Sequence, residues 1–311
     1  MPIVSTKKLF EDAMQHGYAI PAFNVNSMEM VQAVVRTAAA LRSPVIAQFS
    51  KGAREFAGTE YLIALLKTAS EEHPDVPLVI HQDHGPDYDM CVSAIEAGAT
   101  SVMIDASALP FEENIALTKK VVDYAHAHNV VVEAELGELV GEQFDAGEGG
   151  KMSSGAYTDP MKAKEFVERT KCDSLAVSIG TSHGAHKFKG EAHLDIERLQ
   201  EINALIPGVP LVLHGASGVL PDLVQSINDH GGKIEEAHGV SDEMITAAIR
   251  HGVVKINVDT DLRLAMLAGI RESLDEKPDS IDMRTYLGAD REKMAEVVAR
   301  KIKVFGSENR F

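Results

Sequence analysis

The sequence predicts one (β/α)₈ (TIM) barrel domain that spans residues 1–311, and three observations lead to this α/β fold class. Eight short runs rich in apolar and β-branched residues recur along the chain, and each precedes a loop and a helical pattern. Continuous apolar runs of this length are typical of strands buried on both faces of a parallel sheet. The first run ends without the glycine-rich turn that a doubly wound dinucleotide-binding sheet places there. Eight such units in a chain of this length therefore favour the barrel.

The expected strands follow one another with helical segments between them. In chain order the strands are residues 20–25, 44–50, 77–84, 101–106, 130–136, 174–180, 210–215 and 253–259. Helices are expected between them, for example at 28–40, 53–70, 114–128 and 242–251. The long segment 137–160 is rich in Gly, Ser and acidic residues, which is typical of a functional loop. Extra helices are expected after the seventh strand, within 220–240, and after the eighth.

Composition excludes several classes of function. The chain has 30 Lys and Arg residues against 47 Asp and Glu residues, a formal net charge of −17. The basic residues are scattered, so binding of nucleic acid or of an anionic membrane is not expected. Cys91 and Cys172 are the only cysteines, which suits a reducing compartment and excludes a disulfide framework. Without a secretory signal or an apolar run long enough to span a bilayer, the expected location is the cytoplasm.

Three of the expected strand ends deliver a histidine next to a glycine. These are His84, His183 and His214, after the third, sixth and seventh strands. In a TIM barrel the active site forms at the C-terminal ends of the strands. One such histidine alone is more often a structural residue, but three that converge on one rim indicate a metal site. Catalytic zinc is commonly held by three protein ligands, which leave an open position for substrate.

Carboxylates are expected at the same rim. Asp83, Asp105 and Glu135 end the third, fourth and fifth strands. A buried carboxylate is costly unless it binds a cation, orients a ligand or moves a proton. Asp83 directly precedes a candidate metal ligand, so a functional role is favoured for it. For Asp105, capping of the following helix is an equally good interpretation.

The last two strand ends have the composition of an anion site. His214-Gly-Ala-Ser-Gly218 and Asn257-Val-Asp-Thr260 follow the seventh and eighth strands, where barrel enzymes commonly bind phosphate. Glycines let backbone N–H groups approach an anion closely. Gly184 and Lys187 could complete such a site with a point charge, although ordinary tight turns would also use these glycines.

Five segments together resemble the class II fructose-bisphosphate and tagatose-bisphosphate aldolases, which carry zinc. The segments are His81-Gln-Asp-His-Gly85, Glu133-Ala-Glu-Leu-Gly137, Gly180-Thr-Ser-His-Gly184, Leu213-His-Gly-Ala-Ser-Gly218 and Lys255-Ile-Asn-Val-Asp-Thr-Asp261. The resemblance runs in order from Pro21 to residues 284–287, nearly the whole chain. It implies reversible cleavage of fructose 1,6-bisphosphate to dihydroxyacetone phosphate and glyceraldehyde 3-phosphate.

The resemblance also implies a role for individual residues. A zinc ion (Zn²⁺) would be held by the three rim histidines, with Glu135 and Asp105 at a second or alternate metal position. Asp83 would exchange a proton with the C4 hydroxyl of the sugar. Asn24 and Ser50 match positions near the glyceraldehyde-phosphate half. The dihydroxyacetone-phosphate half, often with a monovalent cation (Na⁺ or K⁺), would be bound by Gly184, Lys187, Gly215, Ser217, Asn257 and Thr260.

One loop departs from the pattern of this family. The acid that protonates C3 is usually a Glu on the mobile loop after the fifth strand. Here that loop reads Gly137-Glu-Leu-Val-Gly-Glu142-Gln143, and strict spacing places Gln143 at the acid's position. We assign the proton transfer to Glu142, one residue earlier, because a flexible loop can deliver it. A bound water or Glu138 is the alternative donor.

Four other functions compete with fructose-bisphosphate cleavage. The nearest is tagatose-bisphosphate aldolase, but Asp259 and Arg263 match the fructose-type members, in which the arginine reaches the C6 phosphate across a subunit boundary. A homodimer or homotetramer is therefore expected. A metal-dependent barrel hydrolase would carry a His-x-His pair after the first strand, where this chain has Asn24-Val-Asn26. A Schiff-base aldolase needs a strand-end lysine, and Lys255 lies too early in its strand. A non-catalytic barrel would leave the histidine rim unexplained.

Overall fold

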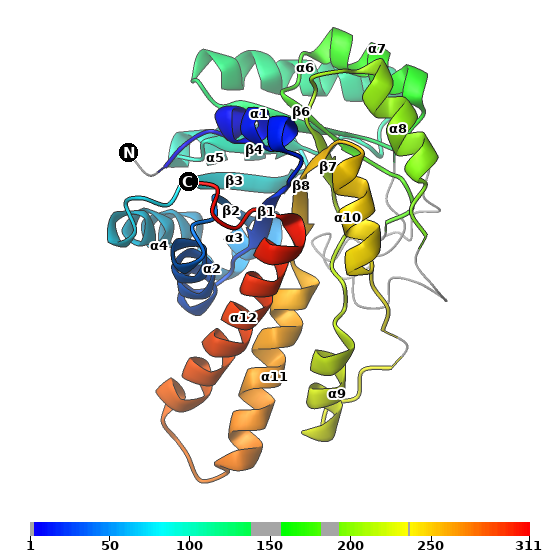
Figure 1. The fold of residues 1–311 in the computed structure, drawn as a ribbon. Helices are drawn as coiled ribbons and strands as arrows, with labels where there is room; N and C mark the ends of the chain where they lie inside the picture. The colour runs from blue at the N-terminus through cyan, green and yellow to red at the C-terminus, as the bar shows by residue number, and fades with distance from the viewer. Residues whose placement is uncertain (1–2, 138–156, 182–192, 236) are drawn as a thin grey trace.

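The computed structural model describes residues 3–137, 157–181, 193–235 and 237–311. Eight parallel strands close into a barrel in the order of the chain, with β8 pairing back to β1 (Figure 1). This confirms the predicted (β/α)₈ fold. The strands are β1 Ile20–Asn24, β2 Val45–Phe49, β3 Leu78–Gly85, β4 Ser101–Ile104, β5 Val131–Leu136, β6 Ser174–Val177, β7 Leu211–Leu213 and β8 Val253–Val258.

Burial explains why these segments form strands. Every strand residue except His84 is buried. Parallel strands covered on both faces need such continuous apolar runs, because helices pack outside and side chains fill the inside. Several strands end earlier than expected, and β7 stops at Leu213. His214 and Ser50 therefore lie just beyond strands, on the rim.

Helices cover the outside of the barrel. α2, α5, α6 and α10 pack directly on strands. Side-chain oxygens of Ser27, Asp87, Asp159, Asp195 and Ser241 cap the first turns of α2, α5, α7, α8 and α10. The helices before β8 are α1 Thr6–His16, α2 Met28–Ala40, α3 Lys51–Ala57, α4 Thr59–Glu72, α5 Tyr88–Ala97, α6 Phe111–Ala127, α7 Pro160–Thr170, α8 Ile196–Leu205, α9 Pro221–Asp229 and α10 Asp242–Arg250.

The predicted extent of one helix is wrong. The segment 53–70 was expected to be continuous, but it is divided between α3 and α4. Gly58 stands between them with φ of +82°, a backbone conformation that glycine adopts without strain. The amide of Gly58 ends α3 by donating to Arg54, and its carbonyl accepts from Leu62 to begin α4.

The extra helices lie where they were expected. α9 and α10 separate β7 from β8, while α11 Thr260–Glu276 and α12 Met283–Phe305 follow β8. α11 and α12 form a long hairpin that projects from the barrel, with α9 beside α11 (Figure 1). Gly269 permits their close approach, because a Cβ there would lie 2.6 Å from Cα of Asp290. Among the described residues, no helix combines the length and apolarity that crossing a membrane requires.

Candidate active site

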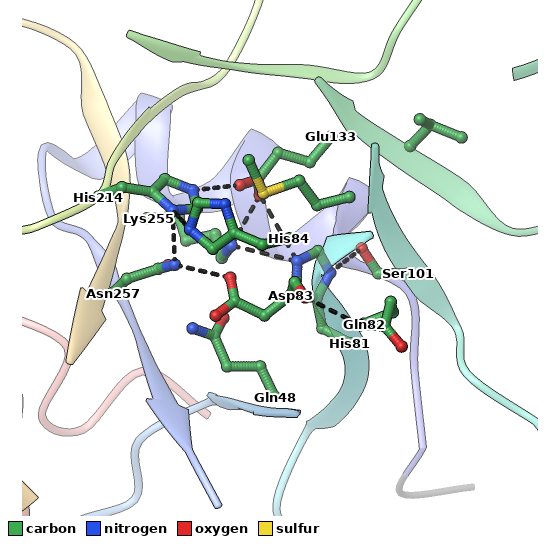
Figure 2. A network of polar contacts seen from close by, with 12 residues as sticks. Gln48, His81, Gln82, Asp83, His84, Ser101, Glu133, His214, Lys255 and Asn257 are labelled. Carbon is green, nitrogen blue, oxygen red and sulfur yellow. Dashed lines mark hydrogen bonds and ion pairs between the residues drawn. The ribbon is translucent and has the colours of Figure 1, made fainter. Parts of the chain in front are cut away.

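β3 presents two consecutive side chains to the barrel mouth because its backbone is irregular at His84. Its register with β4 shifts between Gln82 and Gly85, and His84 has φ of +45°, a conformation uncommon for residues other than glycine. In a regular strand, neighbouring side chains point to opposite faces. The irregularity turns His84 to the same side as Asp83 (Figure 2). Gly85 must follow, because a Cβ there would lie 2.7 Å from the carbonyl oxygen of Met103.

His84 and His214 form the centre of the site. Nε2 of His84 lies 2.9 Å from Nδ1 of His214 (Figure 2). The other nitrogen of each ring contacts a carboxylate: Nδ1 of His84 is 2.8 Å from Oδ2 of Asp105, and Nε2 of His214 is 2.7 Å from Oε1 of Glu133. Ionised carboxylates only accept hydrogen bonds, so these outer nitrogens carry the protons. The inner nitrogens then face one another with their lone pairs, which repel unless a proton or a cation lies between them.

The electrostatics agree with a positive charge between the two rings. Burial alone would lower the pKa of His84, but Asp83, Asp105 and Glu135 outweigh it and raise this pKa to about 10. Burial lowers the pKa of His214 well below its ordinary value, and the neighbouring His84 lowers it further. These two pKa shifts favour one proton shared between the inner nitrogens. A divalent cation would place positive charge at the same position, and the carboxylate behind each ring would orient that ring as a ligand.

Asp83 is held as an ionised carboxylate. Its oxygens accept from Nδ2 of Asn24 at 2.8 Å and from Nδ2 of Asn257 at 3.0 Å. Gln48 fixes Asn24 in turn, through a 2.7 Å hydrogen bond to its Oδ1. Burial raises the pKa of Asp83, but the charges of His84 and its neighbours outweigh burial and keep this pKa below its ordinary value. The arrangement suits a group that accepts a proton.

Asp105 and Glu135 lie on the other side of His84. Asp105 also accepts from the amide and hydroxyl of Ser107 at 3.2 and 2.7 Å, and α6 begins only at Phe111, so Asp105 does not cap it. Oε2 of Glu135 is 3.9 Å from Nδ1 of His84 and has no hydrogen-bond partner among the described residues. Burial and the charge of Asp105 raise the pKa of Glu135 well above its ordinary value. Such a carboxyl group needs a proton or a cation.

Two groups of potential metal ligands follow from these contacts. Asp83, His84 and His214 form the first, and His84, Asp105 and Glu135 form the second. Within each group the ligand atoms lie within 4.8 Å of one another. Nitrogen and oxygen donors that converge on one point, with carboxylates behind the rings, fit a divalent cation.

Sequence reasoning missed the polar network beneath this rim. Oε2 of Glu133 pairs with Nζ of Lys255 at 2.7 Å. Nζ also lies 3.4 Å from Nε2 of His81, whose Nδ1 is 2.8 Å from Oγ of Ser101. All four residues are buried inside the barrel (Figure 2). The signal was the period-two pattern: His81, Glu133 and Lys255 each stand two positions before a rim residue, in β3, β5 and β8.

The loops after β7 and β8 meet beside the histidines. Gly215 has φ of +60°, and the Ser217 hydroxyl accepts from the amide of Asp259 at 3.4 Å. Thr260 opens α11, so the partial positive charge of a helix N-terminus faces this region. Nε of Arg263 pairs with Oδ1 of Asp259 at 2.7 Å, and both side chains are partly exposed.

Of the remaining candidate residues, the structure describes only Ser50. Ser50 lies at the rim, where its hydroxyl caps α3 by accepting from the amide of Ala53 at 3.3 Å. Four candidates lie outside the described residues: Glu142, His183, Gly184 and Lys187.

Known proteins resemble this chain over its whole length. Residues 4–310 match the family described as fructose-bisphosphate aldolase class-II. The fructose-bisphosphate aldolase of Giardia intestinalis is 47% identical over 309 residues, which cover 99% of this chain and 94% of that protein. The fructose-bisphosphate aldolase of Thermus caldophilus is 45% identical over 99% of each chain. Among solved structures, the YdjI aldolase of Escherichia coli K12 has a TM-score of 0.78 and 33% identity, with 99% of each chain covered.

Proposed function

Because the chain belongs to the class II fructose-bisphosphate aldolase family, we propose that its rim of histidines and carboxylates holds a zinc ion for aldol cleavage. The protein is an aldolase that acts on a sugar bisphosphate, cleaving fructose 1,6-bisphosphate reversibly to dihydroxyacetone phosphate and glyceraldehyde 3-phosphate. One observation carries the metal proposal: the inner nitrogens of His84 and His214 face each other at 2.9 Å, with Asp105 and Glu133 behind them.

We assign the zinc ion to His84, His183 and His214. Imidazole nitrogens suit zinc, and three protein ligands leave a position open to substrate. Glu135 and Asp105 are proposed for a second or alternate metal position. Oε2 of Glu135, which accepts no hydrogen bond from the described residues, supports this proposal. When bound, the cation supplies positive charge that stabilises the negative charge developing on the substrate as the C3–C4 bond breaks.

Asp83 is proposed as the group that exchanges a proton with the C4 hydroxyl. In the cleavage direction its carboxylate accepts this proton, and in the synthetic direction it returns it. Its lowered pKa keeps it ionised at neutral pH. The amides of Asn24 and Asn257 donate to one oxygen each, so they fix the plane of the carboxylate before substrate binds. Glu142 is proposed to protonate C3.

The loops after β7 and β8 are proposed to bind the phosphate of the dihydroxyacetone half. Gly215, Ser217, Asn257 and Thr260 are supported by their place beside the histidines and at the N-terminus of α11. Gly184 and Lys187 would complete this site, together with Na⁺ or K⁺. Asn24 and Ser50 are proposed to lie near the other half of the substrate.

Asp259 is proposed to select the fructose epimer, and Arg263 to reach the C6 phosphate. Their ion pair at the barrel mouth is partly exposed, so both side chains can reach a substrate. We also propose that Arg263 acts across a subunit boundary in a homodimer or homotetramer. The two buried free cysteines suit the reducing cytoplasm.

An aldol-cleavage assay on fructose and tagatose 1,6-bisphosphates, with and without a strong chelator, tests this proposal. We expect a preference for the fructose epimer, loss of activity with chelator and recovery with zinc. Borohydride in the presence of substrate should not inactivate the enzyme. Full activity in metal-free protein would contradict the zinc assignment, and a preference for the tagatose epimer would contradict the role of Asp259.

A further inference from the structure

The loop after β7 is held in place by a carboxylate on its outer side. Asp261, in the first turn of α11, accepts from the amide of Gly218 at 2.8 Å and from the amide of Val219 at 2.7 Å. Val219 has φ of +48°, a conformation that a β-branched residue rarely adopts. The two hydrogen bonds stabilise this unfavourable conformation, so Asp261 determines the path of the loop beyond Ser217.

A lysine from the distant end of the chain pairs with this carboxylate. Nζ of Lys301, on α12, lies 2.9 Å from Oδ2 of Asp261, and the two side chains are only 1% and 0% exposed. Its next carboxylate, Asp242, is 3.9 Å away. An uncompensated buried carboxylate would repel an anion bound to the same loop. The ammonium group removes that repulsion.

The same lysine lies against the loop backbone. A Cβ on Gly218 would come within 3.2 Å of Nζ of Lys301. On the other side, a Cβ on Gly239 would lie 2.2 Å from the carbonyl carbon of Gly218, and the amide of Val240 donates to the carbonyl of Ser217 at 3.2 Å. The loop is therefore enclosed between residues 239–240 and α12.

We propose that Asp261 and Lys301 are a positioning pair for phosphate recognition. Asp261 occupies the amides of Gly218 and Val219, which restricts the anion to the part of the loop at Gly215 and Ser217. Lys301 neutralises Asp261 so that the loop attracts phosphate. This inference rests on the proposed function, in which the loop binds the phosphate of dihydroxyacetone phosphate. Neither residue needs to touch the substrate.

Steady-state kinetics of aldol synthesis with the zinc-loaded enzyme tests the pair. Lys301→Met should raise the KM for dihydroxyacetone phosphate about 10-fold, because it leaves the buried charge of Asp261 uncompensated beside the bound phosphate. The KM for glyceraldehyde 3-phosphate and the zinc content should stay unchanged. Inorganic phosphate should inhibit the variant about 10-fold more weakly than the wild type. Should Lys301→Met not fold, Lys301→Gln, which keeps a hydrogen-bond donor towards Asp261 but removes the charge, should shift the same two constants in the same direction.

Lys293→Met is the matched control. Lys293 also joins α12 to α11, through Glu272 at 2.9 Å, but Glu272 accepts from the hydroxyl of Ser226 on α9, whereas Asp261 accepts from the loop after β7. The control should leave both KM values unchanged. An unchanged KM for dihydroxyacetone phosphate in Lys301→Met, or an equal rise in the control, would overturn this inference but not the proposed function. A wild type that cleaves neither bisphosphate would overturn the proposed function as well.

Discussion

Glu133 tests how the barrel interior supports the proposed metal site. Its side chain is 2% exposed and lies 2.7 Å from both Nε2 of His214 and Nζ of Lys255. Glu133→Gln keeps the shape but removes the charge. Lys255 then stays buried without the one carboxylate that it pairs with among the described residues. The neutral side chain of the Glu133→Gln variant would also accept the hydrogen bond from Nε2 of His214 more weakly than the carboxylate does.

Two separate magnitudes follow from these contacts. Breaking one side of a buried ion pair costs about 3–5 kcal/mol of unfolding free energy, a fall on the order of 10 °C in the unfolding midpoint for a chain of this size. Loss of the group that orients a metal-binding histidine weakens metal affinity by about 10–100-fold. Thermal unfolding of the metal-free protein measures the first quantity. Zinc titration against a competing chelator measures the second.

A double variant separates the two effects. Glu133→Leu with Lys255→Met removes both charges and should recover most of the lost stability, because buried ion pairs are often replaceable by apolar residues. It should not recover zinc affinity, since His214 still lacks its carboxylate. Wild-type zinc affinity in Glu133→Gln would refute the orienting role of Glu133. Unchanged thermal stability would refute the idea that Lys255 depends on it.

Three further predictions concern single carboxylates. Asp83→Ala should lower turnover by about 10²–10⁴-fold while zinc content persists. The cleavage assay measures the turnover and metal analysis measures the zinc content. Loss of zinc would make Asp83 a metal ligand instead. Asp259→Ala should reduce kcat/KM much more for fructose than for tagatose 1,6-bisphosphate. The carboxylate is expected to pair with hydroxyls of the fructose epimer and to leave groups unpaired with the tagatose epimer. Equal losses would show that Asp259 binds the shared half. Asp290 on α12 is fully buried, and neither of its oxygens accepts a hydrogen bond of ordinary geometry from the part of the chain that the structure describes. Burial, and secondly the charge of Glu29, raises its pKa from 3.8 to about 7. Folding thus takes up a proton between these values, so this group's contribution to stability falls as the pH rises through that window. In denaturant titrations, Asp290→Ala should be more stable than the wild type by about 1–3 kcal/mol at pH 8 and lose this advantage near pH 4; a pH-independent difference would contradict the raised pKa.

Much of the barrel and its rim was predictable from local sequence. Strands buried on both faces must be apolar throughout, so their C-terminal ends mark the active-site face without any knowledge of pairing. His84, His214 and Asp83 follow from that rule alone. The extra helices after β7 and β8 also follow, because the chain there is too long for a short connection.

Other features depend on contacts that local patterns do not encode. The irregularity at His84 arises from its register with β4, and a regular strand would have turned this ring away from Asp83. Glu133 and Lys255 lie 122 positions apart in sequence, so only closure of the barrel reveals their pairing. The break at Gly58 was visible as a glycine, but an isolated glycine within a helical pattern is often tolerated.

X-ray absorption spectroscopy on protein loaded with one equivalent of zinc tests the central claim most directly. The account predicts imidazole scattering from three histidines with zinc–nitrogen distances of about 2.0–2.1 Å. In His214→Ala, one of these nitrogen ligands should be lost. A wild-type spectrum with only oxygen or sulfur ligands, or one unchanged by His214→Ala, would contradict the assignment of the metal to His84, His183 and His214.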